Sequence, residues 1–198
     1  MIFEPLERDY GGYIFDCDGT LADSMVVHYR AWLAALRVHG ATFDFSWELF
    51  TSRAGMTLPN TVRELNAQFG HALDPEAVTT SQRLEYERYL PTVQPIAEVV
   101  ELALRVAKVC PVSVASGGER NIVRRTLELI GLGQTFPVVV TAEDVIHGKP
   151  APDMFLLAAE RMGVPPTECV VFEDSVLGLQ AAKRANMAAV LVRPPNVR

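Results

Sequence analysis

Short apolar runs of three to five residues occur near the start of the chain and repeatedly in its C-terminal half. Runs of this length that are rich in Val, Ile and Phe are typical of strands buried on both faces of a parallel sheet. Between the later runs, apolar residues recur at helical spacing, and two of these helices should end at Gly131 and Gly163. The predicted strands lie at residues 13–15, 112–115, 137–141, 169–172 and 189–192.

Residues 25–92 contain no convincing strand and are predicted to be helical throughout. Ser24 is a candidate N-cap for the first helix of this block, which should end at Gly40. Asp74 followed by Pro75 is typical of the start of a further helix. Because the block interrupts the alternation of strands and helices directly after the first strand, we expect it to be an inserted lid over the edge of the sheet.

The alternation predicts the α/β fold class, with a Rossmann-like parallel sheet whose two faces are covered by helices. We expect residues 1–24 and 93–198 to form this core and residues 25–92 to form a small helical cap. In open parallel sheets, ligands bind beyond the carboxyl ends of the strands. Candidate functional side chains should therefore follow the predicted strands.

Two aspartates, Asp16 and Asp18, follow the first predicted strand. In extended backbone, side chains two residues apart lie on the same side, so both carboxylates should face one pocket. Two such charges 4 Å apart repel each other by about 4 kcal/mol at an effective dielectric of ~20, and a cation or a proton on one carboxyl relieves this repulsion. A polar turn is the structural alternative. Cys17 should point away from the shared pocket, which argues against a catalytic thiol.

Polar residues of complementary chemistry follow four of the predicted strands. They are Asp16, Asp18, Ser116, Lys149, Glu173 and Asp174. Each alone could be an ordinary loop residue. Together they predict a site for magnesium and phosphate, because carboxylate oxygens suit Mg²⁺ and hydroxyl, ammonium and helix N-terminal N–H groups suit a phosphoryl group. Without Mg²⁺ and Lys149, four carboxylates would repel a phosphate ester.

The charge and composition of the chain argue against some classes of binding partner. The net charge of −6 and the pI of about 5.2 argue against extended nucleic-acid binding. No apolar run approaches the ~18 residues of a membrane span, and the N-terminus does not resemble a signal peptide, so we expect a cytoplasmic protein.

Cys17, Cys110 and Cys169 are odd in number and widely spaced, which indicates reduced thiols. We expect a monomer whose partner is a small phosphorylated metabolite.

The polar residues lie in four motifs. They are Asp-Cys-Asp-Gly-Thr at 16–20, Ser116, Lys-Pro-Ala-Pro-Asp at 149–153, and Glu-Asp-Ser at 173–175 with Gly178. In order and spacing the chain resembles the haloacid dehalogenase superfamily of aspartate-nucleophile phosphatases and phosphomutases, over nearly its whole length. Residues 23–32 and 171–174 are similar to the β-phosphoglucomutase-like branch with a small cap, especially to bacterial fructose-1-phosphate-type sugar phosphatases.

This resemblance implies a role for each motif. Asp16 would attack phosphorus and form an aspartyl-phosphate, and Asp18 would act as general acid and then as general base. The implied metal ligands are Asp16, Asp18 (through its backbone carbonyl), Glu173 and Asp174. The implied phosphate-binding residues are Ser116, Gly117 and Lys149. Whether Glu173 binds the metal directly or supports it from behind stays open.

The cap should select the substrate. His28 occupies the position at which relatives contact substrate or assist proton transfer, although a partly exposed structural histidine is the alternative. Arg83, or Gln82 if the register shifts by one residue, could face the pocket and bind a second anionic or hydroxyl group. In β-phosphoglucomutases a basic residue that grips a second phosphate follows the Gly-x-Thr/Ser step of the lid. Here Leu58 follows Gly55-Met56-Thr57.

The resemblance therefore implies a Mg²⁺-dependent phosphatase that hydrolyses a small sugar monophosphate through an aspartyl-phosphate. The first alternative is a β-phosphoglucomutase-type phosphomutase, which Leu58 disfavours. The second is a non-catalytic regulatory protein that binds a sugar phosphate. The complete set of acids argues against this second alternative.

Overall fold

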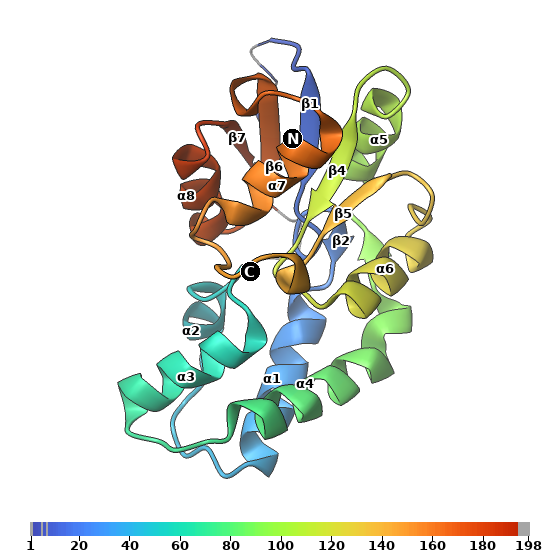
Figure 1. Ribbon diagram of the computed structural model, residues 1–198. Coiled ribbons are helices and arrows are strands. Elements are labelled where there is room, and N and C mark those ends of the chain that lie inside the picture. The colour runs from blue at the N-terminus through green and yellow to red at the C-terminus, as the bar shows by residue number, and fades with distance from the viewer. Residues whose placement is uncertain (1, 5, 7, 194–198) are drawn as a thin grey trace.

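The computed structural model describes residues 2–4, 6 and 8–193. These residues form a five-stranded parallel sheet in the order β5-β4-β1-β6-β7, with β1 at its centre (Figure 1). The strands are β1 (Gly12–Phe15), β4 (Val112–Ala115), β5 (Val138–Val140), β6 (Cys169–Glu173) and β7 (Ala188–Leu191). The predicted α/β sheet is confirmed, and each strand end lies within one residue of its predicted position.

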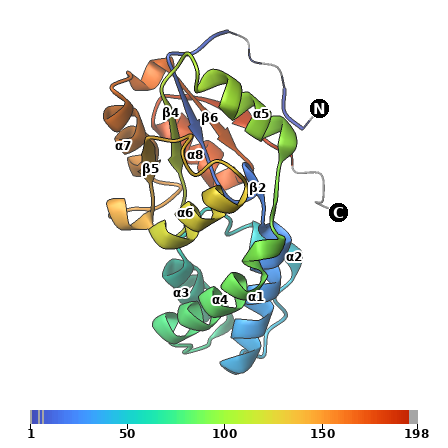
Figure 2. The same cartoon turned by 90° about the vertical axis from the view of Figure 1, so that its right-hand side faces the viewer.

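Helices cover both faces of the sheet, and further helices lie beyond the carboxyl ends of its strands (Figures 1 and 2). They are α1 (Met25–Val38), α2 (Trp47–Thr51), α3 (Leu58–Phe69), α4 (Pro75–Tyr89), α5 (Ala97–Val106), α6 (Arg120–Leu129), α7 (Asp153–Met162) and α8 (Val176–Arg184). Short 3₁₀ helices lie at Leu90–Thr92, Ala142–Asp144 and Pro166–Glu168. Within the described part of the chain, no helix is long and apolar enough to cross a membrane.

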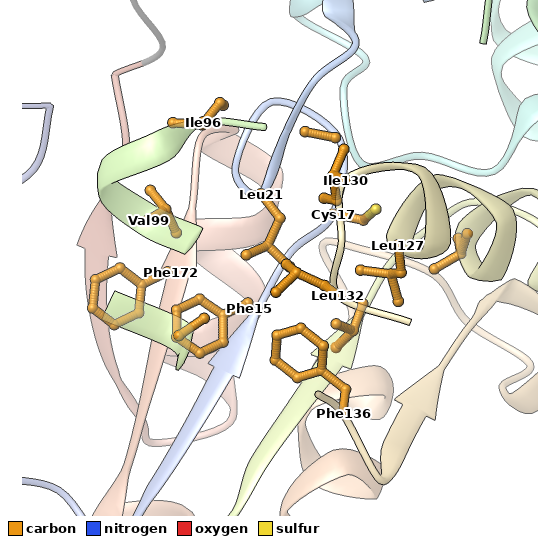
Figure 3. Packing of buried hydrophobic residues seen from close by; sticks show 14 of the residues in the cluster. Phe15, Cys17, Leu21, Ile96, Val99, Leu127, Ile130, Leu132, Phe136 and Phe172 are labelled. Atoms are coloured by element: carbon orange, nitrogen blue, oxygen red, sulfur yellow. The ribbon is translucent and has the colours of Figure 1, made fainter. Parts of the chain in front are cut away.

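Alternate residues of the central strand belong to different hydrophobic clusters. Phe15 packs in the cluster that contains residues of α5 and α6, whereas Ile14 packs in the one that contains residues of α7 and α8. The Phe15 ring stacks on Phe172 of β6 at 5.0 Å between centroids (Figure 3). Cys17 is fully buried in the first cluster, and burial raises the pKa of its thiol well above the ordinary value. The expectation that Cys17 points away from the pocket is confirmed.

Helices α1 to α4, which we call the cap, lie beyond the carboxyl edge of the sheet (Figure 2). The cap has a hydrophobic cluster of its own, which includes Trp32, Phe50 and Leu65. Asp74 caps α4 as predicted, since its carboxylate accepts hydrogen bonds from the first turn. Ser24 precedes α1 but accepts no capping hydrogen bond. Ser24 therefore occupies the predicted N-cap position, but its hydroxyl donates to Asp18 at 2.6 Å and does not cap the helix.

A second, two-stranded sheet joins the two crossings between core and cap. Strand β2 (Ala22–Asp23) pairs antiparallel with β3 (Gln94–Pro95). The sequence did not predict these strands, because two residues are too few to show alternation and Pro is unusual in a sheet. We propose that the pair marks the boundary between a core of residues 1–24 and 93–198 and a cap of residues 25–92.

Candidate active site

A pocket lies between the carboxyl ends of β1, β4 and β6 and the cap. Its core side is lined by Asp16, Asp18, Ser116, Gly117, Glu173 and Asp174. These residues directly end or follow three neighbouring strands, and the parallel arrangement brings those strand ends together. The cap side is mainly apolar and includes Trp32, Phe50, Met56 and Leu58.

Lys149 does not line this pocket itself but connects two of the carboxylates that do. Its Nζ lies 2.6 Å from Oδ1 of Asp16 and 2.8 Å from Oε2 of Glu173, and its side chain is fully buried. Burial acts to lower the pKa of Lys149, but the two carboxylates outweigh it and raise that pKa above its ordinary value. Lys149 is therefore a fixed positive charge beside Asp16.

Glu173 is held rigidly from two sides. Its Oε2 accepts from Lys149, and its Oε1 accepts from the Ser175 hydroxyl at 2.5 Å and the Ser175 backbone N–H at 3.2 Å. A Cβ atom at Gly178 would lie 2.1 Å from Cδ of Glu173, so a side chain there would displace the carboxylate. Since both Glu173 oxygens already accept hydrogen bonds, this residue is better suited to orient Lys149 than to bind a metal directly.

The acids form a cluster with the dimensions of a cation site. One carboxylate oxygen from each of Asp16, Glu173 and Asp174 lies within 4.8 Å of the others. Burial and then repulsion by Glu173 raise the pKa of Asp16 to about 8, and the same causes raise that of Asp174 well above its ordinary value. Crowded oxygen donors that lack sufficient positive charge fit a hard divalent cation such as Mg²⁺.

Asp18 lies in a different electrostatic environment. Its Oδ1 accepts from the Ser24 hydroxyl at 2.6 Å and lies 3.1 Å from Nε2 of His28. Burial acts to raise the pKa of Asp18, but His28 and the hydrogen bond from Ser24 outweigh it and lower that pKa. Its carboxylate is not part of the acid cluster, which leaves only the backbone carbonyl as a possible metal ligand. Two neighbouring acids with opposite pKa shifts are suited to different chemical roles.

The loop after β4 contacts the cap directly. The Ser116 hydroxyl is buried and accepts from the Gly118 backbone N–H at 3.1 Å. A Cβ atom at Gly117 would lie 2.8 Å from the carbonyl oxygen of Gly55, so the absence of a side chain lets the cap approach. Gly55 has φ +89°, a left-handed conformation that favours glycine. The phosphate-binding loop predicted from sequence is therefore covered by the cap.

The two cap residues predicted from sequence have different surroundings. His28 lines the pocket, and its ring contacts Asp18. Arg83 does not line the pocket, because its guanidinium pairs with Glu119 of the core at 2.9 Å. Its neighbour Gln82 is buried and reaches the pocket only through His28. The expectation that Arg83 faces the substrate is corrected by this ion pair.

Three contacts of the site were not predicted from sequence. Tyr86 stacks on His28, Ser175 holds Glu173, and Arg53 lines the cap side. The Arg53 guanidinium donates to the carbonyl of Leu49 and to the side chain of Gln68, so it is bound within the cap. The only sequence signal for Tyr86 is its spacing of four residues from Gln82, which places both side chains on one face of a helix.

Comparisons with family models and with known proteins agree on one family. Residues 10–186 match the model of a family described as haloacid dehalogenase-like hydrolase. The chain is 39% identical over 187 residues to the fructose-1-phosphate phosphatase YqaB of Escherichia coli (strain K12), covering 93% of this chain and 97% of YqaB. It is 31% identical over 190 residues to hexitol phosphatase A of the same organism, covering 93% and 82% of the two chains.

A solved structure agrees with these sequence matches. The crystal structure of a hydrolase from Pseudomonas syringae superposes with a TM-score of 0.83 at 28% identity, covering 90% of this chain and 83% of that one. The fold, the order of the four motifs and the family match all agree. The chain therefore belongs to the haloacid dehalogenase-like hydrolase family.

Proposed function

We propose that this chain, a phosphoric monoester hydrolase, uses Mg²⁺ and an aspartyl-phosphate on Asp16 to hydrolyse a small sugar monophosphate. The proposal depends most on one observation: buried Lys149 lies 2.6 Å from Asp16, beside the cluster of acids. A nucleophilic carboxylate, a fixed ammonium group and oxygen ligands for a cation are the parts that phosphoryl transfer requires. Relatives named as phosphatases of fructose 1-phosphate and of hexitol phosphates support the substrate class.

The reaction has two halves. In the first, an Asp16 oxygen attacks phosphorus while the bond to the sugar oxygen breaks, and Asp18, whose protonated form is favoured by the negative charge of the bound ester, gives its proton to that oxygen. In the second, Asp18 takes a proton from a water molecule, which attacks phosphorus and releases phosphate and the free Asp16 carboxylate. The donors Ser24 and His28 stabilise the unprotonated Asp18 that this second half requires.

The surrounding charges bind the phosphoryl group and hold the nucleophile. Lys149 fixes the Asp16 carboxylate and offsets its charge, and Ser116 offers a hydroxyl to a phosphoryl oxygen. Asp16, Asp174 and the Asp18 backbone carbonyl would hold Mg²⁺, with Glu173 keeping Lys149 in place. When bound, this ion supplies positive charge that neutralises phosphoryl oxygens.

The cap side of the pocket favours a substrate with one phosphate. Trp32, Met56 and Leu58 present mainly apolar surface there. Arg53, the arginine among the described lining residues, has its guanidinium bound by Leu49 and Gln68. A second phosphate would therefore meet little free positive charge, which supports hydrolysis over the mutase reaction.

Incubation with a panel of sugar phosphates and Mg²⁺ should release inorganic phosphate. We expect small sugar and sugar-alcohol monophosphates to be hydrolysed faster than bisphosphates, because the described residues of the cap side offer no free cation to a second phosphate. The measurement is phosphate release for each compound, with product isomers analysed in parallel. An isomer that appears only with a bisphosphate primer would establish the mutase. Binding without either product would support the regulatory protein.

Mg²⁺ should stabilise the protein more at alkaline than at acidic pH. The pKa of Asp16 is raised from 3.8 to about 8 in the folded state, so the folded state binds protons more tightly than the unfolded chain. The stability that these protons provide is complete below the unfolded pKa and is lost as pH rises through the folded pKa. Mg²⁺ must displace them, so its effect should grow over the same interval.

Thermal unfolding with MgCl₂ or with EDTA, at about pH 6 and about pH 8, measures this difference. Mg²⁺ at ~100 times its Kd should add about 2.7 kcal/mol near the higher pH. Asp174→Asn, which removes one proposed ligand, should reduce the gain, whereas Asp9→Asn at an exposed position serves as the matched control. An equal Mg²⁺ effect at both values would contradict the assignment.

A further inference from the structure

A chain of contacts connects the buried interior of the cap to Asp18. Helices α1 and α4 lie side by side in both views (Figures 1 and 2). The His28 ring on α1 stacks on Tyr86 of α4 with centroids 3.9 Å apart and an interplanar angle of 11°. Its Nε2 lies 3.1 Å from Oδ1 of Asp18, and its Nδ1 lies 3.3 Å from Nε2 of Gln82. Both ring nitrogens of His28 are therefore engaged.

The chemistry of Asp18 and Gln82 specifies which ring nitrogen of His28 carries the proton. An ionised carboxylate can only accept, so Nε2 of His28 must donate to Asp18. An amide nitrogen can only donate, so Nδ1 of His28 must accept from Gln82. One arrangement of the neutral ring, with its proton on Nε2, satisfies both contacts. A ring turned by half a rotation would present carbon atoms to both partners and break both hydrogen bonds.

We propose that Gln82 is a positioning residue, whose amide N–H donates to Nδ1 of His28 and fixes the ring so that Nε2–H points at Asp18. The side chain of Gln82 is only 1% exposed and does not line the pocket, so it acts through His28 and not on the substrate. Stacking on Tyr86 fixes the plane of the ring but not which edge faces Asp18. The hydrogen bond from Gln82 determines which edge of the His28 ring faces Asp18.

The inference rests on the proposed function only in giving Asp18 its role in proton transfer. The contacts among Gln82, His28 and Asp18 are features of the fold and do not depend on the substrate. They replace the expectation that residue 82 or 83 binds a second group of the substrate. They also give the cap a direct influence on the acid–base residue of the core.

Nitrogen-15 NMR of the wild-type protein tests the hydrogen-bond arrangement without any assay of activity. With four histidines in the chain, a His28→Gln sample assigns the signals of His28. We expect a protonated Nε2 whose proton exchanges slowly with water, and an unprotonated Nδ1. A protonated Nδ1 in the wild-type chain would overturn the proposal, because Gln82 would then accept through its oxygen.

Two variants test the effect on the reaction. Gln82→Met fills similar space without a donor, and Gln82→Glu keeps the length but replaces the donor with an acceptor. Both should speed exchange of the Nε2 proton and lower kcat roughly 10-fold, a part of what positioned proton transfer contributes. KM should stay within about twofold, since Gln82 does not touch the substrate.

The matched control is Thr79→Val, which removes a buried hydroxyl from the same helix that bonds only to backbone carbonyls. This variant should keep the His28 signals and kcat of the wild type. Wild-type kcat in Gln82→Met would overturn the positioning role and leave only a packing role. If the wild-type protein hydrolyses no ester in the panel, the proposed function fails, and the NMR spectrum still decides the Gln82 contact.

Discussion

Asp16→Asn should lower turnover by about 10⁴-fold or more, the order seen when a covalent nucleophile is removed. The amide nitrogen cannot attack phosphorus, and the Glu173 carboxylate, which also contacts Lys149, already accepts hydrogen bonds through both of its oxygens. Phosphate release under substrate saturation with Mg²⁺ measures the effect. Folding should survive, because the change removes one negative charge from a crowded acid cluster.

The matched control is Asp9→Asn, which makes the same chemical change at an exposed residue. It should retain wild-type turnover and thermal stability. Both enzyme hypotheses require the nucleophile, so this experiment tests the role of Asp16 and not the choice between phosphatase and mutase. Turnover of Asp16→Asn within about 100-fold of the wild type would remove Asp16 from that role.

Lys149→Met should destabilise the metal-free protein by about 3–5 kcal/mol at neutral pH, the usual cost of leaving a buried charge without its partner. The ammonium group is the hydrogen-bonded counter-charge of both Asp16 and Glu173. Turnover should also fall, because the variant loses the positive charge beside the nucleophile. Denaturant unfolding in EDTA measures the free energy of unfolding.

The cost of Lys149→Met should shrink in acid, since protonated carboxyls no longer need a counter-charge. Lys108→Met at an exposed site is the control and should be close to neutral. Adding Glu173→Gln to Lys149→Met should recover part of the stability, which a double-mutant cycle would report as coupling. Wild-type stability of Lys149→Met in EDTA would show that the buried ion pairs are not needed.

The local pattern of apolar runs and glycines was sufficient to predict the architecture of the main sheet and its helices. The apolar runs specified the strands because a strand buried on both faces needs continuous apolar residues, and the glycines marked helix ends because they adopt the left-handed conformation. The principal acids and Lys149 were predicted to lie together because ligands bind where parallel strands end, and the structure does bring them together. The monomeric state and the cytoplasmic location stay predictions.

Other features depended on packing between distant segments. On α4, a rotation of about 100° separates neighbouring side chains, and tertiary contacts decided that Gln82 faces His28 while Arg83 pairs with Glu119. The local signal that made Ser24 a candidate cap could not show that its hydroxyl would reach Asp18. Neither contact was predicted, because local sequence specifies an element but not the surface against which it packs.

The sequence by itself determined the strands of the five-stranded sheet, the main helices and the candidate acids, because the spacing of apolar residues and the chemistry of turns are local properties. Only the tertiary structure decided which acid is paired. The fold places Lys149 beside Asp16 and Glu173, and it places His28 beside Asp18. In the contacts of Lys149 with Asp16 and of His28 with Asp18, the partners are separated along the chain. Burial and charge act through space, so the opposite pKa shifts of Asp16 and Asp18 arise only when the fold assembles their surroundings.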